Sequence, residues 1–157
     1  MITDNFLRLS GSLTAGSATG QTITATANST NVVDLSLARD IGEGEELYVQ
    51  FTLGPANWGA GTSLTPTIVV ADDTALTTNA VTIGTGGLIP VATLVAGYTF
   101  AVRLNPIIAS LGRRYLGVIY TVAGSNFTTA TITADIVTEI QDGKKYYASG
   151  IPTLSNT

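Results

Sequence analysis

Residues 113–139 read RRYLGVIYTVAGSNFTTATITADIVTE and carry the clearest strand pattern of the chain. Apolar side chains alternate with small or polar ones over residues 115–122, and the same alternation returns over residues 130–136. A period of two is typical of pleated strands with one buried face. Between these runs, residues 123–127 include Gly and Asn, which tolerate positive φ and can reverse the chain. The pattern therefore predicts a hairpin of two half-buried strands.

The same kind of pattern recurs along the rest of the chain. Further short runs with strand character cover residues 22–27, 31–37, 47–53, 65–71, 80–83, 88–94 and 98–104. The Gly-rich segment 84–87 is followed by no Lys, so it is interpreted as a hairpin connection rather than a phosphate loop. Helical periodicity is almost absent. We expect an all-β jelly-roll β-sandwich of about eight short antiparallel strands.

The ends of the chain differ from its middle. Residues 10–20 are a mixture of Ser, Gly, Ala and Thr, which buries too little surface to order itself. The preceding residues include Phe6 and Leu7, which are more apolar than a free tail usually is. We therefore expect three parts: an N-terminal arm (1–20), a jelly-roll domain (21–140) and a C-terminal arm (141–157).

Composition lowers the expectation of catalysis. The chain of 157 residues contains no Cys and no His. It therefore lacks the usual transition-metal ligands, any thiolate nucleophile and the commonest general base at neutral pH. Among the remaining carboxylates, Asp72 and Asp73 follow one another at a strand end. This pair is interpreted as part of a turn. We expect no enzyme activity, no catalytic residues, no cofactor and no metal.

Charge and hydropathy bear on the kind of partner. Charged residues make up 11% of the chain, less than half of the ~25% typical of soluble domains. The net charge of -4 argues against nucleic acid as the main partner. Mean hydropathy is +0.35, yet no apolar run is long enough to span a bilayer. A thinly charged exterior costs little to cover, so it suits a protein buried against partners; a solvated, Thr-rich β domain is the alternative.

Besides Phe6 and Leu7 in the N-terminal arm, three groups of residues are candidate contacts. The loop 38–46 carries Asp40, Glu43, Glu45 and Glu46 without EF-hand spacing, so it is interpreted as an acidic loop that faces solvent or a partner. Trp58 stands in the Gly-rich loop 54–61, where it either anchors binding or closes one end of the core. The third group, expected to lie across a partner or to fray, is Lys144, Lys145, Tyr146 and Tyr147.

Several strings resemble the Bbp16 family of tailed-phage capsid cement proteins. They lie at residues 29–35, 38–45, 95–98, 114–117, 120–124 and 145–150. The resemblance implies a jelly-roll virion protein, made in the host cytoplasm, that sits on the outside of an HK97-like head. It implies that the protein clamps neighbouring major capsid protein subunits and has no enzyme activity.

Several partner expectations accompany this resemblance. We expect the two arms to reach adjacent capsid subunits and the loop 40–46 to meet a basic capsid patch. Self-association as a dimer or trimer is also expected. The alternative is a carbohydrate-binding jelly-roll module that uses Trp58 and the pair Tyr146-Tyr147.

Overall fold

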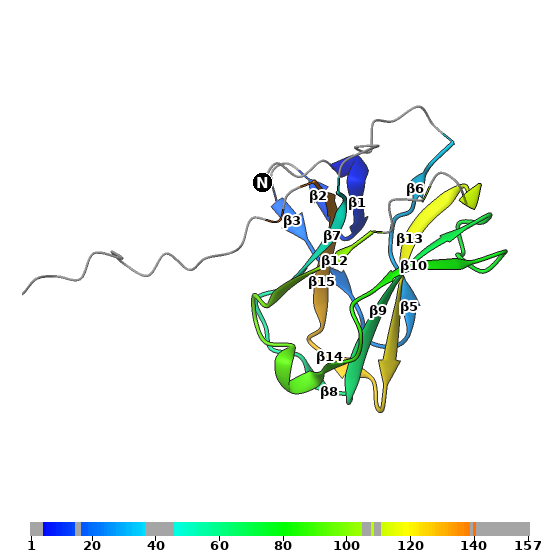
Figure 1. The fold of residues 1–157 in the computed structure, drawn as a ribbon. Helices are drawn as coiled ribbons and strands as arrows, with labels where there is room; N and C mark the ends of the chain where they lie inside the picture. The colour runs from blue at the N-terminus through cyan, green and yellow to red at the C-terminus, as the bar shows by residue number, and fades with distance from the viewer. Residues whose placement is uncertain are drawn as a thin grey trace, which may run out of the picture.

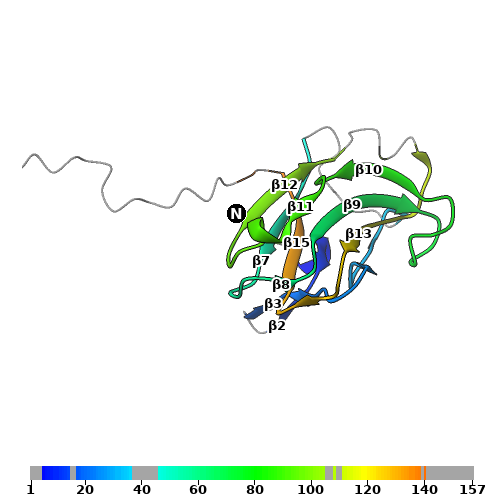
Figure 2. The same cartoon turned by 90° about the horizontal axis from the view of Figure 1, so that it is seen from below.

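The chain folds into two antiparallel β-sheets packed face to face (Figure 1, Figure 2). The computed structural model describes residues 5–14, 17–36, 46–104, 108, 111–138 and 140. In this part of the chain the regular elements are strands and two short 3-10 helices, η1 (Asn5–Leu7) and η2 (Val91–Thr93). No helix within these ranges is long and apolar enough to cross a membrane.

The first sheet is built around β7 and β15. Its strands, in spatial order, are β1 (Arg8–Ser10), β15 (Thr131–Val137), β7 (Tyr48–Leu53) and β12 (Thr99–Arg103), with β4 (Gln21–Thr22) also paired to β15. The pairing is antiparallel throughout. In β7 the burial alternates strictly, because Val49, Phe51 and Leu53 face the core.

The second sheet is built around β9 and β13, which pair along nine residues each. Its strands, in spatial order, are β10 (Val81–Thr85), β9 (Ser63–Ala71), β13 (Tyr115–Ala123) and β5 (Ala27–Asn28), with β11 (Ile89–Pro90) on β9 and β6 (Val33–Asp34) on β13. Two small ribbons complete the fold: β2 (Ser12–Thr14) with β3 (Ser17–Thr19), and β8 (Gly59–Ala60) with β14 (Phe127–Thr128).

The connectivity is that of a jelly roll. We number eight strand positions in chain order: β1 with β4, β5 with β6, and then β7, β9, β10, β12, β13 and β15. The first sheet then has the order 1-8-3-6 and the second the order 5-4-7-2. This double Greek key is the jelly-roll arrangement. The predicted all-β jelly-roll sandwich is confirmed.

The core lies between the two sheets. The predicted alternation holds in both halves of residues 113–139. Leu116, Val118 and Tyr120 of β13 are buried, and so are Ile132 and Ala134 of β15. A row of aromatic rings crosses the core. Its ring contacts are Tyr98 with Phe100 at 5.7 Å between centroids, Phe100 with Phe51 at 4.7 Å, and Phe51 with Tyr120 at 6.3 Å.

The predicted hairpins are wrong, although the strands themselves are present. β13 pairs with β9 in one sheet, whereas β15 pairs with β7 in the other. The segment between them crosses from sheet to sheet and forms β14 on the way. Likewise β10 and β11 do not pair with each other; both pair with β9, which is long enough to take one after the other. Alternation fixes which face of a strand is buried and says nothing about which strand lies beside it.

The predicted N-terminal arm is also corrected. β1 belongs to the first sheet, and its three residues Arg8, Leu9 and Ser10 are buried. The following residues form the β2 and β3 ribbon. The Ser- and Gly-rich composition misled the prediction because β1 is held by partners distant in sequence, such as Asp135 and Tyr120, and because β2 and β3 pair with each other. The predicted C-terminal arm lies outside the described residues.

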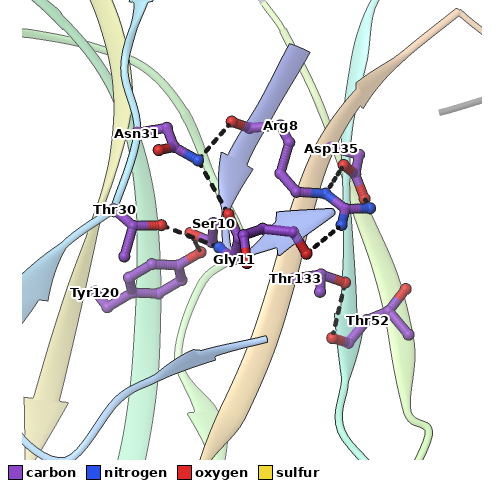
Figure 3. A network of polar contacts seen from close by, with 10 residues as sticks. Arg8, Ser10, Gly11, Thr30, Asn31, Thr52, Tyr120, Thr133 and Asp135 are labelled. Atoms are coloured by element: carbon purple, nitrogen blue, oxygen red, sulfur yellow. Dashed lines mark hydrogen bonds and ion pairs between the residues drawn. The ribbon is translucent and has the colours of Figure 1, made fainter. Parts of the chain in front are cut away.

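A polar network fastens β1 to both sheets (Figure 3). The Arg8 guanidinium donates to both carboxylate oxygens of Asp135, at 2.7 and 3.2 Å. The Ser10 hydroxyl and the Tyr120 hydroxyl are 2.6 Å apart, and the Asn31 amide donates to the carbonyls of Arg8 and Gly11. Burial raises the pKa of the Tyr120 phenol, which therefore stays protonated. The buried charges of Arg8 and Asp135 are thus paired, as burial requires.

Candidate interaction surface

Charged residues are distributed very unevenly along the chain. The segments 9–33, 47–71, 74–102 and 115–134 contain no Asp, Glu, Lys or Arg. In the jelly roll, these segments supply most of the strands and all the loops at one end of the sandwich. The remaining charged residues of the described chain fall at the opposite end or in the buried pair of Arg8 and Asp135. The sandwich therefore has two ends of different chemistry.

We call the first of these the charge-free end and define it by residues 23–26, 54–62, 91–98 and 124–130. It lies at the bottom of Figure 1, around β8 and β14. The register places the four segments together, because Ser63 pairs with Ala123 at the ends of β9 and β13. Leu53 and Ile132 pair at the corresponding ends of β7 and β15. Most residues here are Gly, Ala, Ser, Thr or Asn.

Backbone hydrogen bonds connect the segments of the charge-free end to one another. The Trp58 amide donates to the Leu94 carbonyl at 3.0 Å, and the Thr62 amide donates to the Ala123 carbonyl at 2.8 Å. The Phe127 amide donates to the Thr24 carbonyl at 2.8 Å. The surface is therefore organised before any partner arrives, which lowers the entropy lost on binding.

Aromatic packing supports this end from beneath. Trp58 is only 5% exposed and meets Phe127 edge to face, with ring centroids 5.0 Å apart. Of the two interpretations of Trp58, the structure supports closure of the core and contradicts an exposed anchor for sugar stacking. Gly61 has φ 62°, and a side chain there would strike the ring of Phe127. The Trp58 indole N–H has no acceptor among the described residues.

Exposed apolar side chains add to the charge-free end. Val95, between η2 and β12, is 44% exposed. Leu88, in the segment that links β10 to β11, is 67% exposed and lies close to this end because the next residue, Ile89, pairs with Leu64. Exposed apolar groups without neighbouring charges lower the cost of removing a surface from water.

We call the opposite end the charged end and define its described part by residues 34–36, 46–47, 72–80, 103–104 and 111–114. Each Arg within it is paired. The pairs are Arg114 with Asp34 at 2.8 Å, Arg113 with Asp72 at 3.0 Å, and Arg103 with Glu46 at 2.6 Å. The arginines therefore neutralise acids of this same chain. Residues 37–45, which follow Ser36 and precede Glu46 in the sequence, lie outside the described residues.

Two carboxylates of the charged end have lowered pKa values. The Arg114 guanidinium, with the Ser36 hydroxyl, holds the pKa of Asp34 well below its usual range. The Asp73 carboxylate accepts from the Thr77 hydroxyl and from the amides of Thr77 and Thr78, which lowers its pKa to about 2. Asp73 thus stabilises the turn after β9, and the turn predicted at Asp72-Asp73 is confirmed.

The predicted contact residues do not form one site. Leu7 is half buried and packs against the core, and Phe6 is 72% exposed. Glu46 lies at the charged end, where it also accepts a hydrogen bond from the Tyr48 hydroxyl at 2.7 Å. Trp58 lies under the charge-free end. The other predicted contact residues, Asp40, Glu43, Glu45, Lys144, Lys145, Tyr146 and Tyr147, fall outside the described residues.

No single motif of the sequence points to the charge-free end. The sequence signal for this end is the absence of charged residues over long segments. The overall charged fraction does not show this distribution, because it averages over the whole chain. Within the described ranges, no group of three or more acidic side chains lies close enough together to hold a metal ion. The candidate site of the described chain is therefore an interaction surface rather than a metal site.

Within the described residues, the topology and the segregation of charge define a jelly-roll β-sandwich with one end free of charge. Residues 17–136 match the family model of Bbp16, so the chain belongs to the Bbp16 family. This family is associated with bacteriophages, and its name indicates a structural protein of the phage. A comparison with curated proteins finds no match.

Proposed function

We propose that this protein is a capsid cement protein of a tailed bacteriophage. In this role it binds the outer surface of an HK97-like head and clamps adjacent subunits of the major capsid protein. The observation that carries the proposal is the match to Bbp16 over residues 17–136, which spans both sheets of the jelly roll from β3 to nearly the end of β15.

The surface chemistry supports this function. A cement protein covers part of its own exterior on a shell whose subunits repeat, so modest contacts add through multivalency. Covering a surface is cheap where no ions have to lose their water. The described chain provides such a surface, and its loops are hydrogen-bonded in place. We also propose that the protein self-associates as a dimer or trimer.

Co-sedimentation tests the proposal. Purified empty heads that lack this protein are mixed with it, pelleted and analysed on a gel, with an unrelated acidic β-sandwich protein as the control. We expect the protein to pellet at a fixed ratio to the major capsid protein and to protect the heads against thermal disruption. A protein that stays in the supernatant at every concentration would refute the function.

A further inference from the structure

The two ends of the sandwich are rival candidates for the contact with the shell. The sequence led us to expect the acidic loop 40–46, and so the charged end, to meet a basic patch. The structure adds that the described arginines of that end are already paired with acids of the same chain. Covering this end would remove water from three ion pairs. This desolvation costs free energy unless groups of the partner take the place of that water.

The charge-free end has no such cost. Its exposed groups are hydroxyls, amides, methyl groups and backbone, together with Pro55 and Val95. Hydrogen bonds hold the loops in one arrangement. The Ala96 amide donates to the Asn57 side-chain oxygen at 2.8 Å, and the Thr129 hydroxyl donates to the Asn57 carbonyl at 2.8 Å. Little conformational entropy remains to be lost when a partner covers them.

The described termini leave this end unobstructed. β15 ends with Val137 paired to Tyr48, which is at the charged end. At the other end of the described chain, η1 contacts β15 and leads into β1, where Arg8 pairs with Asp135. The chain therefore enters and leaves the jelly roll away from the charge-free end.

From these observations we propose that the charge-free end is the surface that docks on the outer face of the capsid shell, while the charged end faces solvent. The proposal rests on the cement function and names its contact surface. The partner patch it fits is an uncharged region of the major capsid protein, rich in hydroxyl, amide and apolar groups. Any unpaired charge placed in this contact has to be buried without a counter-ion.

Charge insertion at matched alanines tests the proposal. Ala25 and Ala92 are exposed at the charge-free end, and Ala80 is exposed at the charged end. Each is replaced in turn by Glu and by Lys in the full chain, and binding to empty heads is titrated. We expect Ala25→Glu, Ala25→Lys, Ala92→Glu and Ala92→Lys each to weaken binding by about tenfold or more. Both Ala80 variants are expected to bind within about twofold of wild type.

The use of both signs separates burial from attraction. If attraction to a charged patch governed binding, Glu and Lys would act in opposite directions at the same position. Thermal melts confirm folding, and two positions at the charge-free end keep the test valid if one variant unfolds. Wild-type-like binding by the Ala25 and Ala92 variants, with loss in either Ala80 variant, would overturn the proposal and leave the cement function standing.

Two further outcomes of this experiment would also be informative. If wild type itself fails to bind heads, the cement function fails rather than this orientation. If the Ala92→Glu variant dissociates an oligomer in sedimentation but binds heads normally, the charge-free end joins copies of this chain and the proposal is overturned.

Discussion

The two ends of this jelly roll are held together by different forces. At the charge-free end, the loops are connected by backbone hydrogen bonds and by the contact of Trp58 with Phe127. At the charged end, the described loops are connected by ion pairs at the surface, such as Arg114 with Asp34. Surface ion pairs are screened by salt and keep their hydration, whereas buried aromatic contacts and backbone bonds are not screened in this way. One end is therefore suited to solvent and the other to a partner.

The buried pair of Arg8 and Asp135 shows what charge costs where water is absent. We expect Asp135→Ala to lower the free energy of unfolding by about 3–5 kcal/mol, because it leaves the Arg8 guanidinium buried without its partner. This is the largest effect we expect. Chemical denaturation measures it, and Asp72→Ala at the partly exposed pair with Arg113 is the control. A loss no greater than that of the control would show that the burial of β1 contributes little.

The packing of the charge-free end is tested by a pair of glycines. Gly61 and Gly97 have similar positive φ values, 62° and 68°, but only Gly61 lies against the Phe127 ring. Gly97→Ala is expected to cost about 1 kcal/mol from backbone strain alone. Gly61→Ala adds the displaced ring, for a total of about 2–4 kcal/mol. Equal losses in thermal unfolding would contradict a closely packed support beneath this end.

The ion pairs of the charged end are expected to contribute less. Arg114→Ala removes the pair with Asp34 and the contact of the guanidinium with the Tyr115 ring at 5.0 Å. Because the side chain is largely exposed, we expect only a small loss of stability, and this loss should shrink as salt is added. Denaturant melts at low and high ionic strength measure both. A larger, salt-independent loss would mean that this end is held as rigidly as the other.

The smallest effect we expect concerns pH. Hydrogen bonds lower the pKa of Asp73 to about 2, below the value of about 3.9 in an unfolded chain. Asp73 therefore adds stability above pH ~4, and this contribution is lost as the pH falls towards ~2. The melting temperature of wild type should exceed that of Asp73→Ala at neutral pH, and the gap should narrow in acid. A gap independent of pH would assign the effect of Asp73 to packing.

The sequence was informative where a residue's surroundings are local. Alternation identified the buried faces of β7, β13 and β15, and Asp72-Asp73 identified a turn. It failed where the partner is distant in sequence. Arg8 hydrogen-bonds to Asp135, which is far away in the sequence, and β13 and β15 lie in different sheets. Strand patterns determine which side of a strand is buried, and only the folded topology determines its neighbours.

We expect the protein to meet the capsid shell through a surface without charge. The most direct test is the affinity for empty heads measured across salt, from about 0.05 M to about 0.5 M. We predict that the dissociation constant changes by less than about threefold over this range, since no ions are paired across the contact. A loss of affinity of about tenfold or more with rising salt would contradict the claim and assign the contact to the charged end.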